Sequence, residues 1–297
     1  MSKITNVIVD HFRIPLAVTL TDATHGEMSR FDLITVRITD SDGVVGMGYT
    51  YSLVGGDAIR SLARDSFAPI LLEEDADRIE YLWQKMWWFL HYAGRGGAAS
   101  FAMAAIDIAL WDLKGQKQKT PLWRLLGGHD PKVKAYAGGI DLLFPLEQLL
   151  EQTRRHLDNG FQAIKMKVGR PNISEDVSRV AAMRKELGDD FPLMVDANMG
   201  WRPDQAISAA KALSPFALTW LEEPTIPDDF AGYGRIQREG GIPIAAGENF
   251  HTIYEFQHLV DAGGVSFPEP DVANCGGISI WMKVAHLAEA NNLPVTS

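Results

Sequence analysis

The stretch AIKMKVGRPNISEDVSRVAAMRKELGDDFPLMVDANMG, residues 163–200, decides the fold. It begins with the short apolar strand pattern AIKMKV, continues through the amphipathic segment EDVSRVAAMRKELG, and ends in a second strand pattern, LMVDAN. A strand, a helix closed by glycine and a second strand make one βα unit, in which the two strands pair in parallel. The sequence on both sides repeats this pattern.

Strand patterns recur from Val133 to the end of the chain. The predicted strands are VKAYAGG (133–139), AIKMKV (163–168), LMVDAN (193–198), LTWLEE (218–223), IPIAAGE (242–248), VSFPEP (265–270) and LPVTS (293–297). Seven strands that alternate with helices favour an α/β fold of the (β/α)₈ TIM-barrel type. An open doubly wound sheet is the alternative, but it normally carries a Gly-rich nucleotide turn after its first strand, which this sequence lacks.

The first 128 residues have a different character. The patterns KITNVIVDHFRI (3–14), DLITVRITD (32–40) and GVVGMGYTY (43–51) predict three strands, with a turn at Asp42–Gly43, and a mostly helical segment follows over 57–126. Gly127 and Gly128 end this segment. We therefore predict an α+β domain over residues 1–128 and a barrel domain over residues 129–297.

Composition limits the classes of function. The 297 residues carry a net charge of -10 and the pI is about 5.3, which argues against nucleic acid because phosphate binding needs a basic face. No apolar run reaches the roughly 18 residues of a membrane span, so we expect no membrane partner. The single cysteine, Cys275, cannot form an intrachain disulfide. A cytoplasmic protein with a small-molecule substrate is the expectation.

Two lysines stand in the first strand of the stretch. Lys165 and Lys167 are two residues apart, so their side chains project from the same side of the strand. Two neighbouring ammonium groups repel each other, which lowers the pKa of one of them and prepares it to act as a base. Two solvated lysines on an edge strand are the alternative. The apolar neighbours Met166 and Val168 instead indicate a buried strand.

Acidic residues follow the later strands in the same rhythm. From Lys167 the steps to Asp196, Glu222, Glu248 and Asp271 are 29, 26, 26 and 23 residues, close to one βα unit each. A barrel brings the carboxyl ends of its strands to one rim, so Asp196, Glu222 and Glu248 are expected to converge there. Converging carboxylates need a cation, and oxygen ligands select Mg²⁺, with Mn²⁺ as the alternative. An acid at one strand end can simply cap a helix; three at matching ends favour a metal site.

These motifs resemble the mandelate racemase/muconate lactonizing enzyme branch of the enolase superfamily. The likeness runs along the whole chain and includes AAIDIALWDLKGQ (104–116), KMK, VDAN, LEEP, GEN and PDVANCGGIS (270–279). It implies an N-terminal capping domain and a modified barrel in which Asp196, Glu222 and Glu248 hold Mg²⁺. Glu223 has the weaker claim, because adjacent side chains of a strand point in opposite directions.

The resemblance also implies a chemistry. In this family a base removes the proton next to a carboxylate, and the metal stabilises the resulting enediolate. Lys167 would be the base, while Lys165 would help to neutralise the substrate carboxylate and lower the pKa of Lys167. Asp271 matches an aspartate that orients a histidine at the end of the seventh strand.

The resemblance places that histidine immediately after Ser297. We therefore expect that strand eight and the return segment lie outside this sequence, that the sequence is part of a longer natural chain, and that one sheet edge is open to solvent. The nearest substitute by sequence is His251, which we expect to be a loop or helix-start residue instead.

Substrate choice in this family depends largely on the capping domain. The segment LTDATHGEM (20–28) matches a flap over the active site, and residues 51–56 match a second flap loop. The polar side chains of these regions suit a polyhydroxylated acid, and the residues expected to bind it are Asp22, Thr24, His25, Tyr51 and Asn198.

These residues favour a lyase of carbohydrate catabolism that dehydrates an aldonate or aldarate to a 2-keto-3-deoxy acid, similar to talarate/galactarate dehydratases. A racemase or epimerase of a 2-hydroxy acid, which is an isomerase, and a catalytically silent sugar-acid- or metal-binding relative are the alternatives. The resemblance further implies a homo-oligomer.

Overall fold

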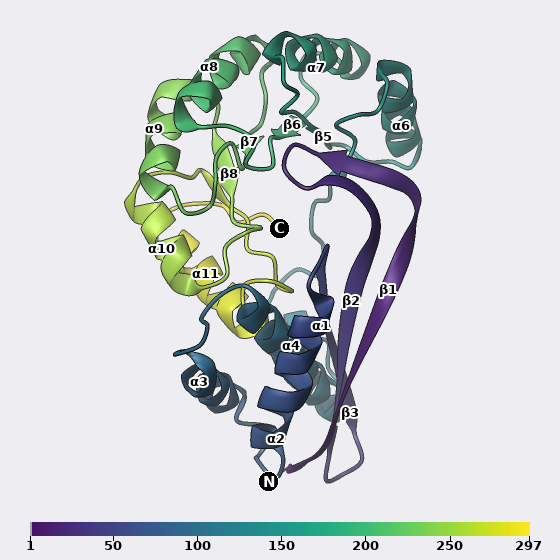
Figure 1. The fold of residues 1–297 in the computed structure, drawn as a ribbon, viewed down its shortest axis with the longest axis vertical. Coiled ribbons are helices and arrows are strands. Elements are labelled where there is room, and N and C mark those ends of the chain that lie inside the picture. The colour runs from purple at the N-terminus through teal and green to yellow at the C-terminus, as the bar shows by residue number, and fades with distance from the viewer. Residues whose placement is uncertain (1) are drawn as a thin grey trace.

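The computed structural model describes residues 2–297 as an antiparallel sheet with helices and a parallel sheet lined by helices (Figure 1). The first sheet has the order β1 (Ile4–Asp22), β2 (Gly26–Asp40) and β3 (Val45–Ser52). The predicted turn at Asp42–Gly43 joins β2 and β3, and Gly43 there has a φ of 79°.

The β1–β2 hairpin is longer than predicted. After a register shift between Pro15 and Leu20, pairing resumes and continues to Asp22 and Gly26. The segment 20–28, predicted as a flap loop, is therefore mostly the end of this hairpin with a tight turn at residues 23–25. This register shift hid the pairing, because it interrupts the alternating pattern that identifies a strand.

Helices cover one face of the first sheet. They are α1 (Gly56–Ser61), the π-helix η1 (Leu62–Phe67), α2 (Ala68–Leu71), α3 (Ile79–Leu90), α4 (Ala98–Gln118) and α5 (Leu122–Leu125). The long helix α4 packs directly on β3, where Gly46 and Gly48 face it. A Cβ at either glycine would clash with the backbone of α4, so these two residues permit the close approach.

The second sheet is parallel and its strands follow the sequence order. They are β4 (Ala137–Gly138), β5 (Ile164–Lys167), β6 (Leu193–Asp196), β7 (Leu221–Glu222), β8 (Ile244–Ala246) and β9 (Phe267–Pro268). The helices between and after them are α6 (Leu146–Asp158), α7 (Ile173–Leu187), α8 (Pro203–Leu213) with the 3₁₀ turn η2 (Ser214–Phe216), α9 (Phe230–Gly240), α10 (Ile253–Asp261) and α11 (Ile278–Ala290). They form an arc outside the strands (Figure 1), which confirms a barrel-type domain.

The predicted final strand LPVTS is wrong. Residues 293–297 carry no strand assignment, and a single backbone hydrogen bond joins them to β9, from Thr296 N to Pro268 O at 3.1 Å. Pro294 has no N–H to donate to a ladder. Beside this segment a cavity of about 1270 Å³ opens between Tyr136, Trp220 and Val295. Across residues 2–297 the parallel sheet thus has six strands.

No helix in this part of the chain is long and apolar enough to cross a membrane.

Asp107 joins the two parts of the molecule. This residue of α4 is fully buried, and its carboxylate accepts hydrogen bonds from Ser279 N at 2.9 Å and Ser279 Oγ at 2.6 Å, at the start of α11. Burial raises the pKa of Asp107 to about 7. Trp111, one helical turn later, donates from Nε1 to Ser279 Oγ at 3.0 Å. The AAID and GGIS motifs therefore form one of the contacts between the capping domain and the barrel.

Replacing Asp107 should destabilise this contact. Asp107→Ala leaves the buried N–H and hydroxyl of Ser279 without their acceptor, so we expect a loss of about 1–3 kcal/mol in the free energy of unfolding. Urea unfolding of the two proteins measures it, with Gln118→Ala at the exposed end of α4 as the control. Equal unfolding midpoints for Asp107→Ala and wild type would contradict the assignment.

Candidate active site

Neighbouring strand ends place the predicted charged residues in one row. Lys167 on β5 pairs in register with Asp196 on β6, and Asp196 pairs with Glu222 on β7. Glu248 follows β8 by two residues. Carboxylate oxygens of Asp196, Glu222 and Glu248 all lie within 4.8 Å of one another, so the structure brings the three predicted ligands together.

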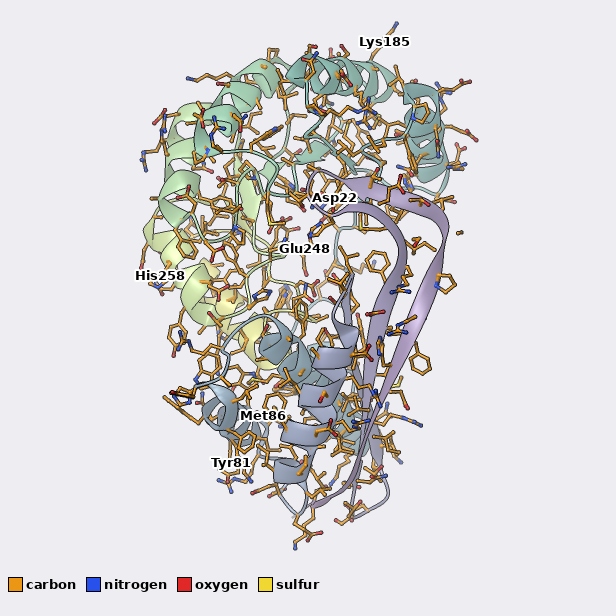
Figure 2. The ribbon with its side chains drawn as sticks, viewed as in Figure 1. Asp22, Tyr81, Met86, Lys185, Glu248 and His258 are labelled. Atoms are coloured by element: carbon orange, nitrogen blue, oxygen red, sulfur yellow. The ribbon has the colours of Figure 1, made fainter. Side chains whose placement is uncertain are left out.

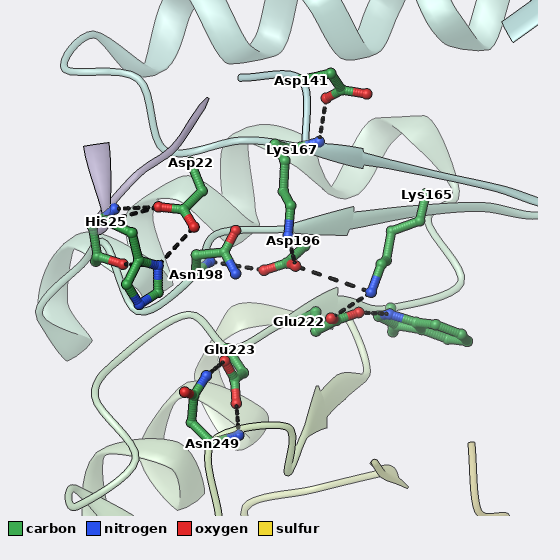
Figure 3. A network of polar contacts seen from close by, with 12 residues as sticks. Asp22, His25, Asp141, Lys165, Lys167, Asp196, Asn198, Glu222, Glu223 and Asn249 are labelled. Carbon is green, nitrogen blue, oxygen red and sulfur yellow. Dashed lines mark hydrogen bonds and ion pairs between the residues drawn. The ribbon is translucent and has the colours of Figure 1, made fainter. Parts of the chain in front are cut away.

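Both lysines of β5 point at these carboxylates (Figure 3). Lys165 Nζ lies 2.5 Å from Glu222 Oε1 and 4.0 Å from Asp196 Oδ2, and Lys167 Nζ is hydrogen-bonded to Asp196 Oδ2. Lys167 is 7% exposed, so this ion pair is shielded from water. The expectation that the two side chains share one side of the strand is met.

The net pKa of Lys167 moves opposite to the prediction. Burial is the largest single effect and lowers this pKa, and the charge of Lys165 lowers it too, as expected, but the charges of Asp196 and Glu222 and the hydrogen bond to Asp196 together outweigh them. The pKa of Lys167 is therefore raised. The sequence shows that the two lysines are neighbours, but the net shift also depends on how closely each ammonium approaches a carboxylate.

The three carboxylates fit a hard divalent cation. Burial, followed by the charge of Asp196, raises the pKa of Glu222 to about 7 and also raises that of Glu248. For Asp196, burial acts upward, but Lys167 and Lys165 together lower its pKa. The two ammonium groups thus offset part of the negative charge of this cluster. An all-oxygen set of buried carboxylates suits Mg²⁺ or Mn²⁺ better than softer metals.

Two further groups orient the cluster. Trp220 Nε1 donates to Glu222 Oε2 at 3.0 Å, and the backbone N–H of Asn198 donates to Asp196 Oδ1 at 2.8 Å. Such outer contacts fix the orientation of ligand carboxylates. The side-chain Oδ1 of Asn198, predicted to bind substrate, is buried and makes no hydrogen bond to any described residue.

Glu223 lies outside the cluster. Its oxygens accept hydrogen bonds from Asn249 N at 3.1 Å and Asn249 Nδ2 at 2.6 Å. Burial raises the pKa of Glu223 to about 8. The second acid of LEEP therefore anchors the asparagine of GEN, in keeping with its weaker claim as a metal ligand.

The turn of the β1–β2 hairpin holds the predicted flap residues. Asp22 Oδ1 accepts hydrogen bonds from Thr24 N at 2.9 Å and His25 N at 2.7 Å, while Asp22 Oδ2 lies 2.7 Å from His25 Nδ1. Thr24 Oγ1 also contacts His25 Nδ1, at 3.3 Å. Figure 3 places Asp22 and His25 beside Asn198, at the edge of the carboxylate cluster.

This turn is docked on the barrel. Leu142 N donates to Thr21 O at 3.1 Å. A Cβ built on Gly169 would lie 2.8 Å from the Cβ of Ala23, and one on Gly200 would lie 2.9 Å from it. The glycines that follow β5 and β6 therefore leave room for the hairpin turn to rest on the rim.

Tyr51 contacts Asp271 across the domain boundary. Its hydroxyl donates to Asp271 Oδ2 at 2.5 Å, and Asn274 Nδ2 reaches the same oxygen at 3.1 Å. Burial raises the pKa of Asp271. Ser297 Oγ donates to Pro270 O at 3.0 Å, so the last described residue lies next to this aspartate. The structure thus places Tyr51, predicted to bind substrate, as a partner of Asp271.

His251 lies in the loop directly before α10, which agrees with the expectation of a loop or helix-start residue. Its backbone N–H donates to Glu255 Oε2 at 2.7 Å, just before α10, and its ring lies 5.4 Å from that of Phe101. Burial lowers the pKa of His251. None of these contacts involves the carboxylate cluster.

Sequence reasoning missed two buried acids. Asp141 Oδ1 accepts the backbone N–H of Lys167 at 3.0 Å and fixes the end of β5. Glu269 is 4% exposed, and neither of its oxygens is hydrogen-bonded to any described residue. The signal for Glu269 was its place in the predicted strand VSFPEP, two residues before Asp271, although β9 itself ends at Pro268.

Comparisons with known proteins agree with this geometry. Residues 148–297 match the family described as Enolase C-terminal domain-like, and residues 4–127 match the Mandelate racemase / muconate lactonizing enzyme, N-terminal domain. The chain is 59% identical over 295 residues to 3,6-anhydro-alpha-L-galactonate cycloisomerase of Streptomyces coelicolor, covering 99% of this chain and 82% of the relative. It is 38% identical over 283 residues to L-talarate/galactarate dehydratase of Salmonella typhimurium, covering 93% and 71%.

Solved structures give the same result. A racemase from Streptomyces coelicolor with bound magnesium superposes with a TM-score of 0.98 at 59% identity, covering 99% of this chain and 83% of that one. An L-talarate/galactarate dehydratase mutant liganded with Mg and L-glucarate superposes with a TM-score of 0.94 at 34% identity, covering 99% and 76%. The chain therefore belongs to the enolase superfamily, in its mandelate racemase/muconate lactonizing enzyme branch.

Proposed function

We propose that this protein removes the α-proton of a sugar acid and expels the oxygen on the neighbouring β-carbon. The observation that carries the proposal is the pair of lysines aimed at three clustered carboxylates. Proton removal next to a carboxylate places negative charge on that carboxylate, and the site must stabilise this charge more than it stabilises the substrate.

Asp196, Glu222 and Glu248 would hold Mg²⁺. The bound ion supplies positive charge that offsets the charge developing on the substrate carboxylate. Lys167 takes the α-proton on Nζ, which requires the neutral amine, and Lys165 supplies a fixed ammonium group beside the same carboxylate. The hairpin turn covers the rim and limits the access of water.

The leaving oxygen decides the overall reaction. In a 3,6-anhydro sugar acid the oxygen on C3 is a ring ether, so breaking the C3–O bond opens the ring and no water is lost. The released oxygen takes a proton, and the enol becomes a 2-keto-3-deoxy acid. In an open-chain aldonate or aldarate the same oxygen leaves as water. Both reactions thus share the same proton removal.

Ring opening of a 3,6-anhydro-aldonate is the first candidate. It is supported by the 59% identity to a cycloisomerase along nearly the whole chain, and it would make the protein an isomerase. Dehydration of an aldarate is the second candidate, supported by the 38% identity to a talarate/galactarate dehydratase. The preference for a lyase, which rested on the polar residues of segment 20–28 and on the resemblance to talarate/galactarate dehydratases, therefore becomes the second choice.

A small substrate panel separates the candidates. The protein with Mg²⁺ is incubated with 3,6-anhydro-L-galactonate, galactarate and mandelate, and the products are followed by NMR and mass spectrometry. We expect a 2-keto-3-deoxy acid of unchanged mass from the anhydro acid. A keto acid that has lost one water, formed only from galactarate, would instead support dehydration. Racemised mandelate without any keto acid would overturn the proposal, and so would Mg²⁺ binding without turnover of any acid.

A further inference from the structure

The backbone N–H of Lys167 has no partner in the parallel sheet. The next residue, Val168, donates its N–H to Asp196 O on β6 at 2.8 Å. Neighbouring N–H groups of a strand point to opposite sides, so the N–H of Lys167 points toward β4. The pairing of β4 with β5 ends at Gly138 and Lys165, before it reaches this N–H. A buried N–H without an acceptor is costly, so the acceptor must come from another group.

The side chain of Asp141 supplies this acceptor (Figure 3). Its Oδ1 accepts the N–H of Lys167 at 3.0 Å, and the residue is 0% exposed. Its Oδ2 accepts from Gln152 Nε2 at 2.8 Å. A Cβ built on Gly139 would lie 2.6 Å from Asp141 Oδ2, so the glycine leaves room for the carboxylate. The carboxylate thus takes the place of a strand carbonyl beside the residue that carries the base.

Arg179 holds the backbone of the same segment. Its guanidinium donates to Asp141 O at 3.0 Å and to Leu142 O at 2.8 Å. It also lies 4.0 Å from the carboxylate of Asp141, and Arg179 is only 5% exposed. Buried groups therefore hold both the main chain and the side chain of Asp141.

The same segment also binds the end of the β1–β2 hairpin. Thr21 forms a parallel bridge with Asp141. Thr21 N donates to Ile140 O at 3.4 Å, and Leu142 N donates to Thr21 O at 3.1 Å. Thr21 Oγ1 accepts a third hydrogen bond, from Leu143 N at 3.2 Å. Asp141 therefore contacts the hairpin through its main chain and β5 through its carboxylate.

We propose that Asp141 is a positioning residue for Lys167, and that the hairpin holds Asp141 in place through Thr21. Proton removal requires Lys167 Nζ within hydrogen-bonding reach of the α-proton, and the backbone of Lys167 sets where that side chain starts. Docking of the hairpin and placement of the base are thereby coupled through one residue. The inference rests on the function proposed above, because it takes Lys167 as the base.

Asp141→Ala tests the positioning role. It removes the acceptor of Lys167 N and leaves every side chain of the carboxylate cluster in place. In deuterated water we expect kcat for exchange of the C2 proton to fall by about 10²-fold, the effect of a displacement of roughly 1 Å. KM and the calorimetric Mg²⁺ affinity should stay close to wild type. The control Asp130→Ala removes an exposed carboxylate that accepts Lys132 N at 2.9 Å, and it should exchange at the wild-type rate.

Asp141→Asn separates the hydrogen bond from the charge. Asparagine keeps an oxygen for the N–H of Lys167, and Gln152 can turn its amide to accept from the new NH₂ group. Exchange should therefore return to within a few-fold of wild type. Wild-type kcat in Asp141→Ala would overturn the proposal. An Asp141→Asn variant as slow as Asp141→Ala would overturn it too, because the hydrogen bond would then not be what positions the base.

Thr21→Val tests the coupling, and it keeps Asp141 if Asp141→Ala fails to fold. Valine has nearly the same shape but lacks the oxygen that accepts Leu143 N. We expect kcat for exchange to fall by about 2–10-fold, the equivalent of one hydrogen bond. Thr5→Val, at the exposed start of the same strand, is the matched control and should exchange as wild type.

The double variant decides whether the two effects are linked. Independent losses multiply, whereas coupled ones do not. We expect Thr21→Val to add little to the loss in Asp141→Ala, because the path from the hairpin to Lys167 is already broken. Multiplied losses, or wild-type kcat in Thr21→Val, would overturn the coupling. If wild type exchanges the α-proton of no sugar acid, the proposed function itself fails.

Discussion

Lys167→Ala is expected to abolish α-proton exchange and to lower kcat/KM by about 10²–10⁴-fold, the usual contribution of a general base. The reason is its position, because Lys167 Nζ is buried against Asp196 at the start of the row of charged strand ends. Alanine offers no group that accepts a proton there. NMR of the C2 proton in deuterated water measures the exchange directly, independently of which oxygen leaves.

Two companion variants sharpen this test. Lys167→Arg keeps a positive charge beside Asp196, but a guanidinium does not release its proton, so it should fold and remain without exchange. Lys185 projects outward from α7, away from the rim (Figure 2), and Lys185→Ala should behave as wild type. Full exchange in either Lys167 variant would remove this residue from the mechanism.

Glu222→Gln is expected to weaken Mg²⁺ binding and to reduce kcat by about 10³-fold, in line with the several kcal/mol that a bound metal contributes to charge stabilisation. The substitution removes one negative charge from the three-carboxylate cluster and also the partner of Lys165. A neutral amide is a weaker ligand for a hard cation. Isothermal titration with Mg²⁺ measures the affinity, and activity assays after chelation and readdition of Mg²⁺ measure the dependence on the metal.

The neighbouring acid provides the internal comparison. Glu223→Gln changes the adjacent residue in the same way, but its oxygens face Asn249 and not the cluster. We expect it to keep its Mg²⁺ affinity within a few-fold. If the two glutamine variants lost affinity equally, the separation of the two acids into ligand and anchor would be refuted.

The positions of the site residues along the strands could be predicted because they follow from local rules. Alternation placed Lys165 and Lys167 on one side, and the parallel βα rhythm brought Asp196 and Glu222 to one rim. Both rules use only spacing along the chain. They require no knowledge of how distant segments pack.

Contacts between distant segments could not be predicted in the same way. Tyr51 meets Asp271 across 220 positions, and Asp107 meets Ser279 across 172. Neither separation follows from the periodicity of a helix or a strand. Neither contact can therefore be predicted before the packing of the two parts of the molecule is known. The predicted direction of the pKa shift of Lys167 was wrong for the same reason, because this shift depends on the distance between its ammonium group and a carboxylate on another strand.

The register shift between Pro15 and Leu20 has a mechanical consequence. The hairpin turn with His25 is the far end of a ribbon whose other end is anchored in the capping core, where Ile4 and Ile38 are fully buried. On the β1 side, regular pairing is interrupted only at this shift and near Ile4. Opening of the site should therefore proceed by bending of an intact ribbon at this point, so that the rim is uncovered while the turn keeps its own hydrogen bonds.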